Sequence, residues 1–179
     1  MQINIDVTGL LSVGNITDCN GFTTDATHYL NFRAASGQAH AGYYDATKAG
    51  FVATSNTDVF QTSLQNYTRF DRLQFVNSSN SLLYGQGFNL YSSTDFCGYE
   101  ITNCVFHRYG RPAGNVQDGT AFRWSQLQVR AFTIANCVFS GSWYRGIENN
   151  YAFASSSIRI YNNTLIGMSG DTGLIGYGI

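Results

Sequence analysis

The chain has 179 residues, of which 12% are charged and 15% aromatic, and its ten basic and eleven acidic residues give a net charge of −1. This balance gives no reason to expect nucleic-acid binding or attraction to an anionic membrane. One Pro and 19 Gly residues, with abundant Asn, Ser and Thr, are typical of a turn-rich all-β protein rather than a disordered chain.

The first residues carry neither the basic head nor the apolar run of a signal peptide, and no segment approaches the length of a membrane span. We therefore expect a chain that folds in the cytosol without membrane insertion. Strand-like runs follow at residues 3–7, 29–32 and 50–52, but their spacing is irregular throughout residues 1–69. Between them lies a polar and aromatic cluster that shows no local catalytic motif, and it comprises His28, His40, Tyr43, Tyr44 and Asp45.

The most regular feature is a motif that occurs three times: ITNCVF at 101–106, IANCVF at 134–139 and IYNNTL at 160–165. Its asparagines, Asn103, Asn136 and Asn162, are separated by 33 residues (103 to 136) and by 26 residues (136 to 162). A degenerate earlier copy is assigned to Asn77, which is 26 residues before Asn103 (77 to 103). Repeats of this length without helical periodicity predict a stack of β-strand coils.

In such a stack, like residues lie on like residues about 4.8 Å apart. We expect Cys104 and Phe106 to point inward with Val105 outward, Cys104 to lie beside Cys137 as a reduced core thiol, and the asparagines to form a ladder at the corner. A second series in phase with the first, Phe122, Ile147 and Leu174, supports the stacking. The prediction is one all-β solenoid domain of about six or seven coils over residues 1–179, irregular over 1–69 and regular over 70–179.

The I-x-N-C-x-F rungs resemble those of the right-handed parallel β-helix proteins of the pectate-lyase-like superfamily, which include phage tailspike and decoration-type proteins. The resemblance covers residues 70–179 by repeat and residues 20–55 more loosely. It implies a right-handed parallel β-helix. Because this scaffold serves polysaccharide lyases and hydrolases, phage tailspikes and decoration proteins, and adhesins, it implies no single function.

Catalysis on this scaffold would require facing carboxylates. The candidates are Asp118, Glu148 and Asp171, which could line up on neighbouring coils, although carboxylates that solvate turns are the plainer interpretation. No lyase motif is present. Because the four cysteines lack paired spacing and histidine partners, we expect no metal site and no cofactor.

The long 33-residue step indicates an insertion over residues 107–118, and insertions in solenoids often carry binding sites. Exposed aromatic rings and arginines there would suit a glycan or a protein partner, whereas tryptophans packed in the core are the alternative. The predicted binding residues are His107, Arg108, Tyr109, Arg111, Trp124, Trp143, Tyr144 and Arg145.

The chain also reaches residue 179 in the middle of a rung, so we expect the stack to continue on a partner, on another copy or in a longer chain. The preferred hypothesis is a non-enzymatic structural or binding component of a larger assembly, such as a decoration, tail or spike part of a phage virion, or a surface adhesin. Its partners would be other subunits, itself (a trimer by analogy) or a glycan, and its location the virion or extracellular surface after assembly. The alternative is a polysaccharide lyase or glycoside hydrolase, or a fragment of one.

Overall fold

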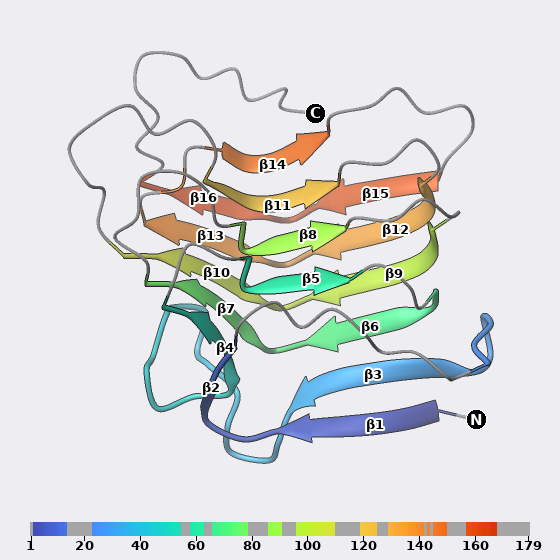
Figure 1. Cartoon of the computed structure of the whole chain (residues 1–179), viewed down its shortest axis with the longest axis horizontal. Coiled ribbons are helices and arrows are strands. Elements are labelled where there is room, and N and C mark those ends of the chain that lie inside the picture. The colour runs from blue at the N-terminus through green and yellow to red at the C-terminus, as the bar shows by residue number, and fades with distance from the viewer. Residues whose placement is uncertain are drawn as a thin grey trace.

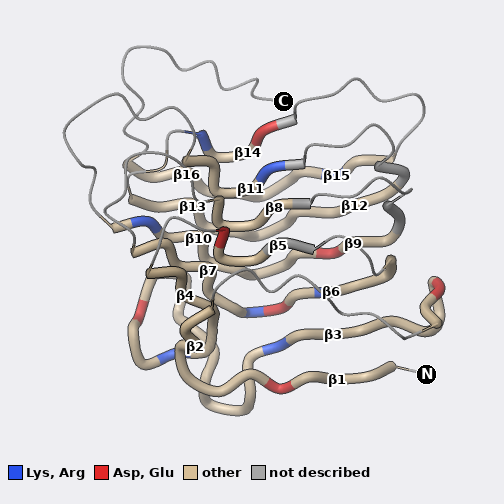
Figure 2. Tube along the Cα trace, viewed as in Figure 1, with Lys and Arg blue, Asp and Glu red and all other residues tan. Residues whose placement is uncertain are grey.

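The computed structural model describes residues 2–13, 23–54, 58–62, 66–78, 86–90, 96–109, 119–124, 129–141, 143, 145–149 and 157–167. Within these residues the secondary structure consists of strands, which pair in three sheets (Figure 1). Charged residues are scattered over the sheets rather than gathered in one patch (Figure 2).

Sheets A and B each contain six strands, and sheet C contains four. Sheet A consists of β1 (Gln2–Val7), β3 (Tyr29–Ala34), β6 (Thr68–Asp71), β9 (Phe96–Thr102), β12 (Val129–Ala135) and β15 (Ser157–Tyr161). Sheet B consists of β2 (Leu10–Ser12), β4 (Gly50–Ala53), β7 (Gln74–Asn77), β10 (Val105–Arg108), β13 (Val138–Gly141) and β16 (Thr164–Ile166). Sheet C consists of β5 (Phe60–Thr62), β8 (Phe88–Leu90), β11 (Thr120–Trp124) and β14 (Arg145–Asn149).

The chain visits the sheets in a fixed cycle from A to B to C, and each strand pairs in parallel with the strands one coil before and after it. The described strands form six coils, with a sheet C strand in the second to fifth coils. The path from β1 toward β16 in Figure 1 turns as a right-handed helix, the usual hand of parallel crossovers. The predicted all-β, right-handed parallel β-helix is therefore the observed fold.

The corner between sheets A and B is a two-residue turn in the last four coils. Its first residue has a positive φ in every case: 56° at Arg72, 55° at Asn103, 55° at Asn136 and 54° at Asn162. Asparagine tolerates this left-handed conformation better than most residues, which explains why it recurs there. The assignment of Asn77 to this series is corrected, because Asn77 is the buried last residue of β7 and pairs with Arg108.

The core consists of aromatic columns that run along the axis. On sheet B the ring of Phe106 stacks between Phe75 and Phe139, with centroid distances of 4.9 and 4.8 Å. Phe60, Phe88 and Phe122 form the matching column on sheet C, with successive centroid distances of 5.0 and 5.4 Å. The columns meet in the middle, where rings of sheets A, B and C contact one another edge to face.

The second corner residue also points inward. The thiols of Cys104 and Cys137 are free and buried, and each lies near a carbonyl oxygen one coil earlier, that of Phe70 (3.7 Å) and that of Ile101 (3.6 Å). Asn163 continues the column, since its Nδ2 donates to the Ile134 carbonyl at 3.0 Å. These residues therefore stack as a polar and thiol ladder inside the corner. Cys19 and the side chain of Cys97 lie outside the described residues.

Candidate binding surface

A longer connection interrupts the regular corners in the second coil, where residues 35–49 join β3 to β4. Gln74 attaches this insertion to sheet B: its Oε1 accepts from the Asp45 amide at 2.8 Å, and its Nε2 donates to the carbonyls of Asp45 (2.9 Å) and Lys48 (3.2 Å). Gln74 is fully buried by these contacts. The insertion therefore lies over the outer face of sheet B.

The insertion also explains an unexpected burial. Val105 points outward from the coil, as predicted, yet it is fully buried, as is Val76 on the neighbouring strand. Both residues alternate with the inward Phe column and so point away from the core. Their burial is consistent with cover from residues 35–49, which a repeat pattern alone could not reveal.

Tyr44 of the insertion forms an aromatic cluster with His107 and Tyr109. The Tyr44 and His107 rings are stacked with centroids 4.7 Å apart, and Tyr109 meets Tyr44 and His107 edge to face at 5.1 and 4.8 Å. Burial and a hydrogen bond to Tyr109 raise the pKa of Tyr44 to about 12. His107 Nδ1 is 2.9 Å from the Ser140 hydroxyl, and burial lowers the His107 pKa. The sequence analysis assigns Tyr44 to one polar and aromatic cluster, and His107 and Tyr109 to the predicted insertion at residues 107–118. The fold brings the three rings together.

Parts of this cluster remain open to solvent. Tyr109 is 41% exposed, and Tyr43, next to Tyr44 in the chain, is 63% exposed. We call Tyr43, Tyr44, His107 and Tyr109 the sheet-B surface. It presents tyrosine rings with polar tips on a base that buried hydrogen bonds and ring stacking hold in place.

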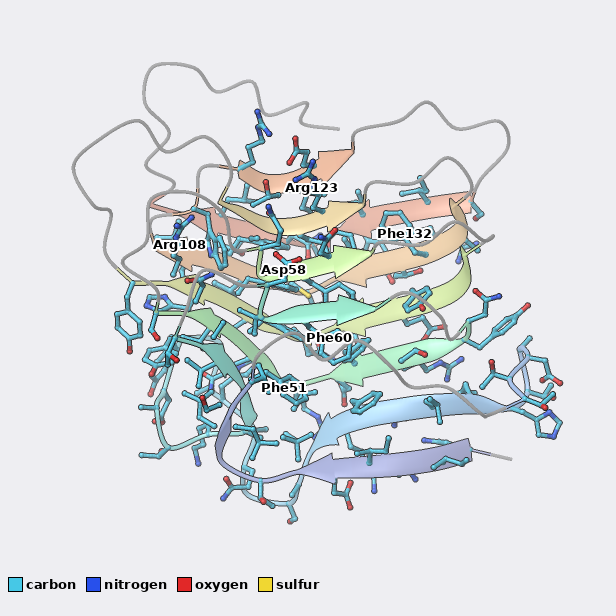
Figure 3. All side chains as sticks on the ribbon, in the orientation of Figure 1. Phe51, Asp58, Phe60, Arg108, Arg123 and Phe132 are labelled. Atoms are coloured by element: carbon cyan, nitrogen blue, oxygen red, sulfur yellow. The ribbon has the colours of Figure 1, made fainter. Side chains whose placement is uncertain are left out.

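Arg108 and Trp143 do not belong to this surface. Arg108 occupies the inward end of β10 and is only 3% exposed, and its Nε and Nη1 have no hydrogen-bond partner among the described residues. Its guanidinium lies 5.8 Å from the centroid of the Trp143 ring, and burial lowers the pKa of Arg108. Arg108 is labelled in Figure 3. Trp143 is fully buried and donates from Nε1 to the Phe106 carbonyl at 3.2 Å. The expectation that both residues contact a partner is therefore corrected: they pack inside the solenoid, where sheet B leads into sheet C.

Sheet C carries a row of polar side chains on its outer face. Asn89, Arg123 and Glu148 lie in register on successive coils. Glu148 accepts from the Thr120 hydroxyl at 2.8 Å, pairs with Arg145, and lies 3.8 Å from Arg123. Glu148 and Arg145, named from the sequence as catalytic and binding candidates respectively, are thus engaged with each other.

Asp58 lies at the other end of this row. It accepts from the Gln86 amide and from Asn89 Nδ2, both at 2.8 Å, and burial raises its pKa (Figure 3). Asp58 precedes β5 in the second coil, and Glu148 is in β14 of the fifth. Asn89, which bonds Asp58, and Arg123, which lies near Glu148, are register neighbours and lie between the two carboxylates.

The remaining predicted residues lie elsewhere. Arg111, Asp118, Tyr144 and Asp171 are outside the described residues, as are the side chain of Trp124 and Leu174 of the second series. Phe122 and Ile147 of that series pair in register, as expected. Among the described residues, no three His, Cys, Asp or Glu side chains gather in a way that could hold a metal ion.

Comparison with protein-family models, curated proteins and solved structures finds no significant match to this chain. A search of the described residues finds no helix with the length and apolar character needed to cross a membrane.

Proposed function

We propose that this chain is a non-enzymatic β-helix that acts as a structural and binding component of a larger assembly. Examples are a decoration, tail or spike part of a phage virion, or a surface adhesin. The observation that carries the proposal is the sheet-B surface, where the exposed Tyr109 meets the stacked rings of Tyr44 and His107, and the exposed Tyr43 is next to Tyr44 in the chain.

Such a surface suits a protein partner. Tyrosine rings supply large apolar contact area with a polar tip and are enriched at the centres of interfaces. Ring stacking and the contacts of Gln74 already order the base of this surface, so little conformational entropy would remain to be lost on binding. The partner would be another subunit, and the virion or extracellular surface would be reached through assembly.

The polar row on sheet C gives less support to a polysaccharide lyase or glycoside hydrolase. Glu148 is engaged by Arg145, Arg123 and Thr120. Asp58 is separated from it by two coils of the stack. Among the described residues, Asn89 and Arg123 lie between these two carboxylates, so the pair does not face across an open gap as the carboxyls of a glycosidase do.

Site-specific photocrosslinking tests the proposal. A photoreactive phenylalanine analogue replaces Tyr43 in one variant and Glu100 in another. The Glu100 side chain is 43% exposed on β9, in the interior of sheet A, and serves as the control. After irradiation in a lysate of the native host, we expect position 43 to capture one protein subunit from a large particle, and Tyr109→Ala to reduce that capture. Equal capture at both positions, or none at position 43, would contradict the proposal.

Two further measurements separate the other partner classes. Competition by a soluble host polysaccharide for the position-43 crosslink would identify a glycan as the partner, as expected of an adhesin. Shortening of that polysaccharide by the purified chain would overturn the non-enzymatic assignment.

A further inference from the structure

The two ends of the coil stack carry the same apolar pattern. On sheet B one inward column runs in register through Leu11, Phe51, Phe75, Phe106, Phe139 and Leu165. The four phenylalanines are at most 3% exposed, whereas the terminal members, Leu11 and Leu165, are 46% and 54% exposed. Within the part of the chain that the structure describes, each end of the column thus lacks the register neighbour that covers every interior member.

Sheet A repeats this arrangement. Its inward columns begin at Ile3 and Ile5 on β1 and finish at Ile158 and Ile160 on β15. All four isoleucines are only partly buried against the core. Ile5 and Ile160 are the two ends of one column of register partners. The interior members of this column are Phe32, Phe70, Ile101 and Ile134. The two ends therefore present isoleucines and a leucine at matching lateral positions.

The backbone edges also match. β1 and β2 are the outermost strands at one end of sheets A and B, and β15 and β16 are outermost at the other, as Figure 1 shows by their blue and orange colours. Because every strand pair in these sheets is parallel, a second molecule shifted along the axis would meet the β15 and β16 edges with its β1 and β2 in the same direction. Among the described strands these two edges have no partner, and an unpaired strand edge readily accepts such an addition.

Charge favours this order of stacking. The only charged residue on β15 and β16 is Arg159, which is exposed, and the only one on β1 and β2 is Asp6. Continuing the register places Arg159 opposite Asn4 and beside Asp6 of the next molecule. Within the chain, Arg33 lies directly opposite Asp6 and pairs with it at 2.6 Å; Arg159 would approach the Asp6 of the next molecule diagonally.

We infer that a second copy of this chain stacks head to tail on the first, with β15 and β16 of one molecule pairing in parallel with β1 and β2 of the next. Leu165 would then cover Leu11, and Ile158 and Ile160 would cover Ile3 and Ile5. Such a contact is heterologous and does not close, so it extends into a filament. It uses the ends of the stack and is independent of the sheet-B surface.

Sedimentation velocity over a range of protein concentrations tests the inference. For the unmodified chain we expect a weight-average mass that rises above 19.7 kDa with concentration. Leu11→Asp and Leu165→Asp should each remain at the mass of a single chain, because the buried charge prevents one end of each variant from packing on a second molecule. An equimolar mixture of the two should form a dimer of twice the chain mass and stop there, since only one intact junction is possible.

Tyr43→Asp is the matched control on the outer face, and it should assemble as the unmodified chain does. Because Leu11 and Leu165 are about half exposed, both variants are expected to fold; Leu11→Gln and Leu165→Gln replace them if circular dichroism shows otherwise. A monomeric unmodified chain at all concentrations would overturn the inference and leave the ends to another occupant. Association of either variant by itself, or a mixture that grows beyond the dimer, would overturn the head-to-tail arrangement.

Discussion

The ring of Tyr44 lies against the imidazole of His107, with an interplanar angle of 10°, although the two residues belong to the second and fourth coils. This contact joins the insertion at residues 35–49 to the regular part of the solenoid. The exposed aromatic surface therefore lies on sheet B, whereas Trp143 is buried and does not contribute to it.

Replacing Tyr44 with Ala should loosen the insertion while leaving the coils intact. The lost stacking contributes about 0.5–1.5 kcal/mol beyond burial, and the interior columns do not depend on it. Hydrogen exchange should therefore accelerate at the Asp45 and Lys48 amides, which bond to Gln74 and to Asp45, but not at Val105 within sheet B. Tyr43→Ala is the control, since Tyr43 is largely exposed, and it should leave these rates unchanged. Unaltered exchange at Asp45 and Lys48 in Tyr44→Ala would show that Gln74 alone holds the insertion.

Mild acid should destabilise the protein through His107 and His40. Burial lowers the pKa of both imidazoles relative to about 6.5 in the unfolded chain. A lowered pKa in the folded state means that the unfolded state binds more protons, so the stabilisation is complete above pH of about 6.5 and is lost as pH falls through the folded-state values. Urea unfolding at pH 7.5 and 5 should give a smaller free energy at the lower pH, and His107→Phe should reduce that difference. A pH-independent free energy over this interval would contradict the prediction.

The repeat could be predicted from sequence because its cause is local. Each coil needs inward apolar residues on both sides of one left-handed corner, and Ile101, Cys104 and Phe106 supply that pattern directly. The earlier copy of the repeat is wrongly assigned to Asn77 because asparagine is taken as the marker of the corner. Phe70, Leu73 and Phe75 have the same apolar spacing, with Arg72 at the corner. The spacing of buried residues was thus the more reliable signal.

The sheet-B surface could not be predicted in the same way. Tyr44 meets His107 only because residues 35–49 fold over the outside of strands that come later in the chain. The repeat pattern of the sequence carries no information about such a contact. The available signal was a group of aromatic and polar residues, Tyr43, Tyr44 and Asp45, in a segment without repeats. Conversely, Trp143 and Arg108 are residue types common at interfaces, yet both side chains are buried inside the solenoid.

Phe106→Ala should be among the most damaging single substitutions in the described part of the chain. Phe106 is fully buried and stacked on both faces, so its removal leaves a cavity in the middle of the sheet B column. Losses for such truncations are about 3–5 kcal/mol. Phe106→Leu, which retains most of the volume, should lose clearly less in the same urea titration. A loss below about 1 kcal/mol for Phe106→Ala would indicate that neighbouring rings close the cavity.

Substitutions of Asn136 distinguish two physical explanations for the recurrence of asparagine at the corner between sheets A and B. If side-chain hydrogen bonds between coils maintain it, Ala and Gly at this position should each cost about 1 kcal/mol. The structure favours the other reason: Asn136 has a φ of 55°, its side chain is exposed, and its backbone amide donates to the Tyr161 carbonyl at 3.3 Å. Asn136→Ala should then cost about 1–2 kcal/mol through the left-handed backbone, while Asn136→Gly should be nearly neutral in urea unfolding. Arg72→Asn, at the equivalent corner with a φ of 56°, should be neutral or stabilising for the same reason. Equal losses for Ala and Gly at position 136 would restore the hydrogen-bond explanation.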